Sequence, residues 1–318
     1  MFTFTVPGSS QKFLDKSRSL SADCVIYDLE DSVTPHKKAD ARALVRRALD
    51  QPVPPDIREQ AVRINSVESG LALKDLTDVL QSPNLSTIVV PKVNSASDLT
   101  FVTDVVSHTL ATRPKQQAPQ SLSGRPQISL LALIESAKSI TNLPQICSST
   151  PFLQGLIFAA EDFALDLSLT RTPSLTEFLF ARSAIVTAAR AHDLPSTIDL
   201  VCTAYKSLTP DGSPPPVLEE ESRGGKRLGF NGKQCIHPSQ VATVQRVFSP
   251  EPEEVEWAVR VMIADAKATA AGRGAWSLDG KMIDVPVVEK AKAIVRKAGA
   301  CRVDVGAIKS RWKDQQPE

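Results

Sequence analysis

The chain has 318 residues, of which 42% are hydrophobic and 23% are charged, ordinary values for one large globular domain or two modest ones. The formal net charge is +1, so the balance of basic and acidic residues does not favour a nucleic-acid surface. No apolar run is long enough to span a bilayer, and the first residues lack the charged and apolar regions of a secretion signal. We therefore expect neither a nucleic-acid nor a membrane partner, and a cytoplasmic or mitochondrial matrix location.

Short apolar runs follow one another along the chain, and most of them precede a longer amphipathic stretch. The eight runs cover residues 2–8, 24–31, 61–66, 87–93, 128–136, 155–163, 196–202 and 229–238. Their near-continuous apolarity is typical of strands buried on both faces, and their alternation with helix-like stretches indicates βα units. Eight such units predict a (β/α)8 TIM barrel. An open doubly wound sheet is the competing architecture, although no G-x-G-x-x-G motif follows the first run.

Two segments have the composition of loops or insertions. Residues 113–127 and 209–225 are rich in Pro, Gly and Ser, which favour turns and irregular backbone over regular elements. We expect both segments to lie on the surface, where solvation alone would account for their charges.

The chain after the eighth run has a helical pattern. Residues 249–272 place apolar side chains at helical spacing. A hairpin is expected around Asp279–Gly280, and a last helix is expected after Asp284, which stands where an N-cap would. We therefore predict a barrel over residues 1–248 and a C-terminal helical extension over residues 249–318.

The polar residues that end the apolar runs are the candidates for chemistry, because the functional residues of a barrel come from the carboxyl ends of its strands. Glu135 and Asp162 close the fifth and sixth runs, and Arg63 lies near the end of the third. A carboxylate at the end of a buried strand costs free energy unless it is paired or binds a ligand such as a metal ion. Two carboxylates with open positions for water and substrate suit Mg²⁺, with Mn²⁺ as an alternative ion. The three converging His or Cys ligands typical of zinc are not evident.

Each of these residues also has a structural interpretation that the sequence leaves open. Glu135 could support a cap on the following helix through its neighbour Ser136, and Asp162 could itself be an N-cap. Arg63 could pair with the acids of the "DLED" segment, and Asp284 could be a plain N-cap. Two unrelated caps explain Glu135 and Asp162 less well than a shared metal ion does.

Several segments together resemble one family. They are "VPGSSQKFLDKS", "ADCVIYDLEDSVTPHKKADAR", "VRINSVESG", "VVPKV", "LIES", "AAEDF", "RLGFNGKQCIHPSQV", "GRGAW" and "DGKMIDVPVVEKA", which run from Val6 to about Ala298 in the family's order. The chain is similar to the citrate lyase β-subunit-like family, which includes malyl-CoA and citramalyl-CoA lyases. The pattern is most similar to the eukaryotic citramalyl-CoA lyase-like branch.

The resemblance implies a (β/α)8 barrel whose C-terminal helical extension acts as a lid, usually in a homotrimer. It implies that Glu135 and Asp162 bind Mg²⁺ and that Arg63 grips the carboxylate of a 2-keto acid. Asp284 would be the catalytic acid or base, delivered by the lid of a neighbouring subunit. The positions that match a coenzyme A site are Thr5, Lys12, Lys16, Pro35, His36, Lys37, Lys38, Gln234 and Cys235.

The resemblance also implies the reaction. We expect a Mg²⁺-dependent carbon–carbon lyase that cleaves or forms a 3-hydroxyacyl-CoA, such as citramalyl-CoA or malyl-CoA, with acetyl-CoA and a 2-keto acid as the other species. One alternative is a malyl-CoA thioesterase, and another is a citryl lyase subunit that acts on a carrier-protein thioester. A non-catalytic binding protein is disfavoured, because both acids, Arg63 and Asp284 are all present.

Overall fold

The computed structural model describes all residues except 1, 113–127, 207–213 and 302, and it divides the chain into two compact units. The first unit is Met1–Gln245 and the second is Arg246–Glu318. The predicted loop at 113–127 and the start of the predicted loop at 209–225 lie outside the described residues. None of the helices within the described ranges is long and apolar enough to cross a membrane.

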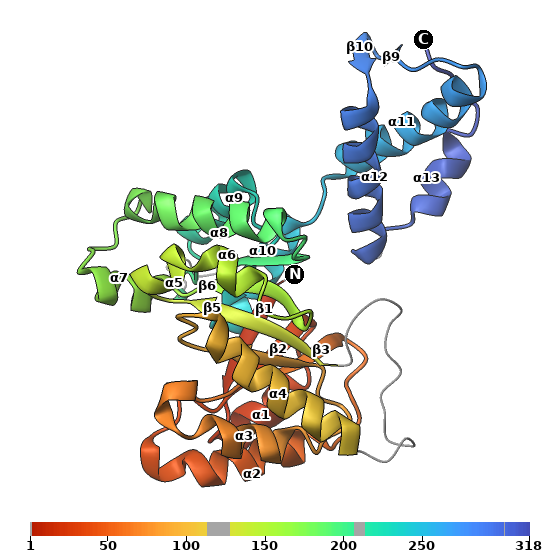
Figure 1. The fold of residues 1–318 in the computed structure, drawn as a ribbon. Coiled ribbons are helices and arrows are strands. Elements are labelled where there is room, and N and C mark those ends of the chain that lie inside the picture. The colour runs from red at the N-terminus through yellow and green to blue at the C-terminus, as the bar shows by residue number, and fades with distance from the viewer. Residues whose placement is uncertain (1, 113–127, 207–213, 302) are drawn as a thin grey trace. The chain divides into compact units, whose positions relative to one another are not determined.

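The first unit is built on a closed barrel of eight parallel strands, in the order of the chain (Figure 1). The strands are β1 Phe2–Pro7, β2 Ala22–Asp28, β3 Ile57–Arg63, β4 Thr87–Val90, β5 Ser129–Ile134, β6 Leu153–Phe158, β7 Ser196–Asp199 and β8 Gly232–Cys235. Pairing of β1 with both β2 and β8 closes the sheet. The structure therefore confirms the predicted (β/α)8 barrel and excludes the open doubly wound sheet.

Helices follow the strands and cover the barrel, as the amphipathic stretches predict. They are α1 Gln11–Ser17, α2 Lys38–Leu49, α3 Ala72–Val79, α4 Ala96–Thr112, α5 Ala137–Thr141, α6 Leu143–Cys147, α7 Ala160–Leu167, α8 Leu179–Ala191, α9 Pro216–Leu228 and α10 Pro238–Phe248, with short 3₁₀ turns η1 Pro35–Lys37, η2 Val67–Ser69 and η4 Thr176–Phe178.

The prediction of a loop through residue 225 is wrong for its second half, because α9 begins at Pro216. A proline in the first turn costs a helix nothing, since the first N–H groups have no partner within the helix. Buried Leu218, Ser222 and Gly225 then form the face of α9 that packs inward. Glu219 and Arg223 pair one turn apart at 2.7 Å on its surface. The content of proline and glycine alone therefore does not distinguish a loop from a helix in this segment.

The interior of the barrel is apolar in its middle and polar at its carboxyl end. A buried cluster fills the middle with Cys24, Ile26, Ala61, Val89, Leu131, Leu133, Ile157 and Ile198. Successive side chains of a strand alternate between its faces, so the residue two positions after an inward residue also points inward. This alternation brings Asp28, Arg63 and Glu135 to the carboxyl-end opening of the barrel, above the apolar layers.

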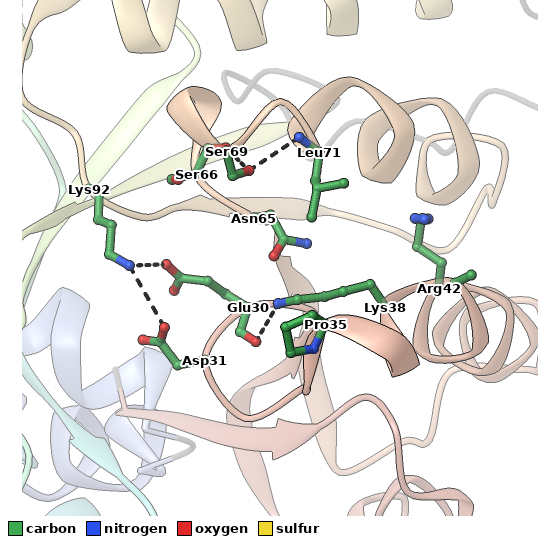
Figure 2. Close-up of a pocket in the computed structure, with 11 residues that line it drawn as sticks. Glu30, Asp31, Pro35, Lys38, Arg42, Asn65, Ser66, Ser69, Leu71 and Lys92 are labelled. Atoms are coloured by element: carbon green, nitrogen blue, oxygen red, sulfur yellow. Dashed lines mark hydrogen bonds and ion pairs between the residues drawn. The ribbon is translucent and has the colours of Figure 1, made fainter.

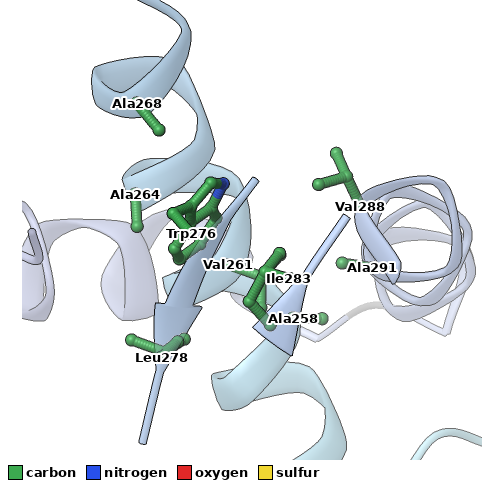
Figure 3. Close-up of a cluster of buried hydrophobic side chains, with 9 residues drawn as sticks. All are labelled: Ala258, Val261, Ala264, Ala268, Trp276, Leu278, Ile283, Val288 and Ala291. Atoms are coloured by element: carbon green, nitrogen blue, oxygen red, sulfur yellow. The ribbon is translucent and has the colours of Figure 1, made fainter. Parts of the chain in front are cut away.

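After α10, the described residues of the second unit form three helices and a hairpin. They are α11 Pro252–Ala270, the strands β9 Trp276–Leu278 and β10 Lys281–Ile283, α12 Val285–Ala300 and α13 Val305–Arg311. Figure 3 shows the apolar cluster that joins the hairpin to two of the helices, in which Trp276, Leu278 and Ile283 lie among side chains of α11 and α12. The predicted helix, hairpin and N-cap are confirmed, because Asp284 caps α12. The role of this unit as a lid stays a prediction.

Candidate active site

The carboxyl ends of β2 to β6 carry a group of charged side chains. Because the strands are parallel, these ends meet at one rim of the barrel. Asp28 ends β2 and Arg63 ends β3, and the two are register partners in the sheet. Lys92 follows β4, Glu135 follows β5, and Asp162 comes shortly after β6.

Arg63 is held by a bidentate pair with Asp28. Its Nε donates to Oδ1 at 2.7 Å and its Nη2 donates to Oδ2 at 2.8 Å. Asp28 also accepts from the hydroxyl and N–H of Ser32 and from the N–H of Glu30. Although burial opposes ionisation of Asp28, the contacts with Arg63 and these hydrogen bonds lower its pKa. The structural interpretation of Arg63 is therefore realised, and it leaves the Nη1 side of the guanidinium for other contacts.

That remaining side of Arg63 faces two further acids. Its Nη1 lies 3.1 Å from Glu30 Oε2 and 3.6 Å from Asp31 Oδ2. Lys92 approaches the same acids, with Nζ 3.0 Å from Glu30 Oε1 and 3.8 Å from Asp31 Oδ1 (Figure 2). Burial raises the pKa of Glu30, and the charges of Arg63 and Lys92 partly offset that rise.

Lys92 has a backbone φ of 52°, a left-handed conformation that is uncommon for a residue with a side chain. Lys92 lies in the fourth apolar run, residues 87–93, and is not among the candidate residues predicted from the sequence. Its position directly after a buried strand and a proline was the signal that could have marked it.

None of the described Lys or Arg side chains forms an ion pair with Glu135 or Asp162, although the charge of Arg63 partly offsets the effect of burial on the pKa of both acids. Glu135 is 6% exposed, and burial, then the charge of Glu30 and then that of Asp162 raise its pKa to about 8. Burial, followed by the charge of Asp31, raises the pKa of Asp162. The charge of each acid thus makes ionisation of its neighbours harder, which is the electrostatic setting that a bound cation would relieve.

The helix caps beside these two acids are made by other residues. Ser136 caps α5, and its hydroxyl accepts from Ser139 N in a reciprocal capping box. Asp162 lies in the first turn of α7, whose N-cap is Ala159, so Asp162 is not an N-cap. The carboxylates of Glu135 and Asp162 are therefore not explained by capping.

The chemistry of this donor set fits an ion that binds few protein ligands. Within the described residues, no group of three or more His, Cys, Asp or Glu side chains is placed to hold a metal. A pair of carboxylates matches Mg²⁺, which takes one or two acids and keeps several waters. Glu135 and Asp162 are the two residues of the rim that would hold it.

A pocket of about 590 Å³ opens beside Arg63's acidic partners (Figure 2). It is lined by Glu30, Asp31, Pro35, Lys38, Ala39, Arg42, Asn65, Ser66, Ser69, Leu71 and Lys92. Lys38 lies at its edge and donates from Nζ to Leu29 O at 2.8 Å and to Glu30 O at 2.7 Å. Lys38 therefore fixes the backbone of the segment that presents Glu30 and Asp31.

The remaining residues predicted for coenzyme A come from β8, β1 and β2 and the segments after them, which are adjacent in the barrel. In the first group, Thr5 is half-buried in β1, and Lys12 and Lys16 are exposed on α1. Lys12 and Lys16 are one turn apart, and among the described residues neither forms an ion pair.

The other predicted coenzyme A residues are more engaged with the protein. Pro35, His36 and Lys37 are exposed in η1, where Lys37 pairs with Asp40 at 3.2 Å. Gln234 donates from Nε2 to Phe158 O at 3.0 Å. Burial raises the pKa of Cys235 to about 12, so its thiol stays protonated.

Asp284 lies in the second unit, and its local role there is structural. Its Oδ1 accepts from Val287 N at 3.3 Å at the start of α12. Its neighbours Met282 and Val285 are 73% and 69% exposed. Its assignment as the catalytic acid or base stays a prediction.

The protein is a closed (β/α)8 barrel whose rim carries acidic side chains around a bidentate Asp28–Arg63 pair. This combination places it in the class of barrel enzymes whose active site can bind a metal ion. Residues 2–238 match the family model described as HpcH/HpaI aldolase/citrate lyase. The chain therefore belongs to the HpcH/HpaI aldolase/citrate lyase family and is a lyase.

Individual relatives agree with this family. The chain is 35% identical over 302 residues to the mitochondrial citramalyl-CoA lyase of Homo sapiens, covering 92% of this chain and 84% of that protein. It is 31% identical to a (3S)-malyl-CoA thioesterase of Cereibacter sphaeroides, covering 93% of each chain. Among solved structures, it resembles the protein CitE from Mycobacterium tuberculosis in complex with magnesium, acetoacetate and coenzyme A. In that comparison the TM-score is 0.68, the identity is 28%, and 94% of this chain and 97% of the other are covered.

Proposed function

We propose that the protein is a Mg²⁺-dependent carbon–carbon lyase that cleaves or forms a 3-hydroxyacyl-CoA with a carboxylate on the hydroxylated carbon. Citramalyl-CoA, which would give acetyl-CoA and pyruvate, is the first candidate, and malyl-CoA is the second. The observation that carries the proposal is the acids Glu135 and Asp162, which form no ion pair with a basic side chain in the described part of the chain, beside an Arg63 already oriented by Asp28. The similarity to a citramalyl-CoA lyase over most of the chain supports this substrate class.

Glu135 and Asp162 would hold Mg²⁺, with Mn²⁺ as an alternative ion. When bound, the ion acts as a Lewis acid toward the oxygens of the hydroxyl group and the neighbouring carboxylate. Arg63 would bind the carboxylate of the substrate with its Nη1 side, in place of the contacts that Nη1 makes with Glu30 and Asp31, while the Asp28 pair keeps the guanidinium oriented.

The bond changes follow from the substrate. Glu30, which lines the pocket, accepts the proton of the 3-hydroxyl group, and its raised pKa suits a general base. The bond between C2 and C3 then breaks, and its electron pair passes to the thioester as an enolate. Asp284 donates a proton to C2, which completes acetyl-CoA and leaves the 2-keto acid. In the direction of synthesis, Asp284 removes that proton.

For Asp284 to reach the substrate, the second unit would act as the lid of a neighbouring subunit, most simply in a homotrimer. The exposure of Met282 and Val285 on both sides of Asp284 supports a contact there with another surface. The coenzyme A moiety would lie along Thr5, Lys12 and Lys16, the segment Pro35–Lys38, and the backbone of Gln234 and Cys235. The two exposed lysines of α1 would meet its phosphates. The relative in human mitochondria favours the mitochondrial matrix over the cytoplasm.

Hydrolysis is the second candidate, because one relative is a malyl-CoA thioesterase. A test that separates the two incubates the purified chain and Mg²⁺ with malyl-CoA, citramalyl-CoA and citryl-CoA, and it identifies every product. The lyase gives acetyl-CoA and a keto acid, whereas a thioesterase gives free CoA and the hydroxy acid. Turnover of a CoA thioester by the isolated chain would also exclude dependence on a carrier protein.

A further inference from the structure

The last residues of the chain lie against the hairpin that leads into Asp284. We name residues 312–318 the C-terminal strap. The family model ends at residue 238, so the strap is outside the part of the chain that defines the family. Every contact described below lies within the second unit.

Arg260 of α11 joins the turn of the hairpin to the strap. Its Nη1 and Nη2 donate to the two carboxylate oxygens of Asp279 at 2.8 and 2.7 Å. Its Nε donates to Gln315 Oε1 at 2.8 Å, and its guanidinium lies 4.4 Å from the centre of the Trp312 ring. One side chain therefore uses both edges and one face of its guanidinium to hold the turn and the strap together.

The turn held by Arg260 has a demanding backbone. Asp279 and Gly280 have φ angles of 51° and 70°, as a two-residue turn between short antiparallel strands requires. Asp279 is the member of this pair that carries a side chain in the left-handed region, and Arg260 binds that side chain.

Glu318 adds a second hold on the hairpin. Its N–H donates to Ser277 O at 2.9 Å, and Ser277 N donates to Glu318 O at 3.2 Å. The strap thus pairs with the edge of β9 that faces away from β10. The side chain of Glu318 accepts from Asp279 N at 3.3 Å and from Gly280 N at 3.4 Å.

Lys267 anchors the middle of the strap to α11. Its Nζ donates to Gln315 O at 2.7 Å and to Lys313 O at 3.2 Å. The strap is therefore bound to α11 through Gln315 and to the hairpin through Glu318.

The hairpin needs such support. Its two strands have three residues each, and a two-stranded hairpin alone is marginally stable in water. One face is secured by Trp276, Leu278 and Ile283 in the apolar cluster of Figure 3. The turn and the outer edge depend on Arg260 and the strap.

The hairpin in turn sets the position of Asp284, because β10 ends at Ile283, the residue before it. We propose that Arg260 and the C-terminal strap are positioning elements that hold the hairpin, and through it Asp284, in the orientation needed for proton transfer. This inference rests on the proposed role of Asp284 as the acid or base.

The test compares Arg260→Met with Arg311→Met in the full-length chain. Arg311 lies on α13 in the same unit and pairs with Glu256 at 3.1 Å, so its variant also removes an Arg–carboxylate pair but leaves the strap contacts in place. Asp279→Asn is the second variant, because asparagine tolerates the left-handed turn and removes the charge and one of the two acceptors that Arg260 binds. Each variant is measured by amide hydrogen exchange of residues 276–283, by kcat and KM, and by Mg²⁺ binding.

The account predicts that Arg260→Met speeds exchange in residues 276–283 and lowers kcat by about 10- to 100-fold, as a displaced catalytic group does, with KM and Mg²⁺ binding unchanged. Asp279→Asn should change both quantities in the same direction but less, and Arg311→Met should change neither. Unaltered exchange in Arg260→Met would overturn the inference, and so would faster exchange with full kcat.

Failure of the proposed function has a different signature. An unmodified chain that turns over none of the three CoA thioesters would refute the lyase proposal and, with it, the catalytic meaning of the strap. The exchange measurement would still show whether Arg260 and the strap hold the hairpin.

Discussion

The acidic side chains in two regions of the barrel rim differ in the charged groups that surround them. After β2, the carboxylates of Asp28, Glu30 and Asp31 face the cations of Arg63 and Lys92 at distances of 2.7–3.8 Å. After β5 and β6, burial raises the pKa of both Glu135 and Asp162, and the charge of Asp162 raises that of Glu135 further. The acids after β2 are therefore neutralised by basic side chains of the protein, whereas the acids after β5 and β6 fit an added cation.

We expect the largest effect on activity from substitution of Glu135 or Asp162. Glu135→Gln or Asp162→Asn should lower kcat by about 10³-fold, because each removes a ligand of an ion that stabilises developing charge. The released keto acid measures the loss. Glu161→Gln is the matched control, since Glu161 adjoins Asp162 in α7 but pairs with Arg171. Substantial turnover in Glu135→Gln would contradict the assignment.

The half of the rim with matched charges should respond to a change of geometry rather than of charge. Arg63→Lys keeps the positive charge but loses the bidentate contact with Asp28, so kcat/KM should fall by about 10²-fold. Asp28→Asn keeps the Arg63 side chain but removes the charged partner that orients it. Because Asp28 is 0% exposed, that variant should also lose about 3–5 kcal/mol of stability, which chemical denaturation would measure. A fully active Arg63→Lys enzyme would argue against the clamp.

Residues away from both halves should have smaller effects. Lys12→Ala and Lys16→Ala should each raise KM for the CoA thioester by about 2- to 5-fold without altering kcat, since each removes one exposed charge opposite a phosphate. The difference should shrink at high salt. Lys74→Ala, an exposed lysine on α3, is the control. Equal KM values for all three variants would place the phosphates elsewhere.

The smallest expected effect concerns the stability of the metal-free chain. The pKa of Glu135 is about 8 in the folded chain, against 4.5 for a free side chain. Between these values the unfolded chain releases a proton that the folded chain retains, so rising pH destabilises the metal-free protein through this group. Glu135→Gln removes that penalty and should raise the metal-free Tm by about 2 °C or more above pH 8, but not below pH 4.5. Added Mg²⁺ should reverse the order of the two proteins, and thermal scans across this pH range would show it.

Much of the barrel could be predicted from the sequence, because strands buried on both faces leave long apolar runs and the helices leave amphipathic ones. The residues that end the runs were therefore identifiable, including Glu135 and Arg63. Asp162 was placed at a strand end, whereas it lies in the first turn of α7. Apolarity alone does not mark where a buried strand gives way to a helix that begins with alanines.

Other features depend on contacts that no local pattern encodes. The choice between a substrate clamp and a partner for Asp28 could not be made for Arg63, since the two residues are distant in sequence and meet only through barrel register. Lys38 was predicted to line a coenzyme A site, yet its Nζ donates to two backbone carbonyls. The left-handed backbone of Lys92 and the start of α9 at Pro216 were likewise invisible to composition.

The central claim is that Glu135 and Asp162 form a magnesium site, and calorimetric titration of Mg²⁺ tests it most directly. The titration is made above pH 8 with pyruvate present, on the unmodified chain, Glu135→Gln, Asp162→Asn and Glu161→Gln. The account predicts saturable uptake of one ion by the unmodified chain and by Glu161→Gln, and none by the other two. Absence of uptake by the unmodified chain, or equal uptake by Glu135→Gln, would contradict it.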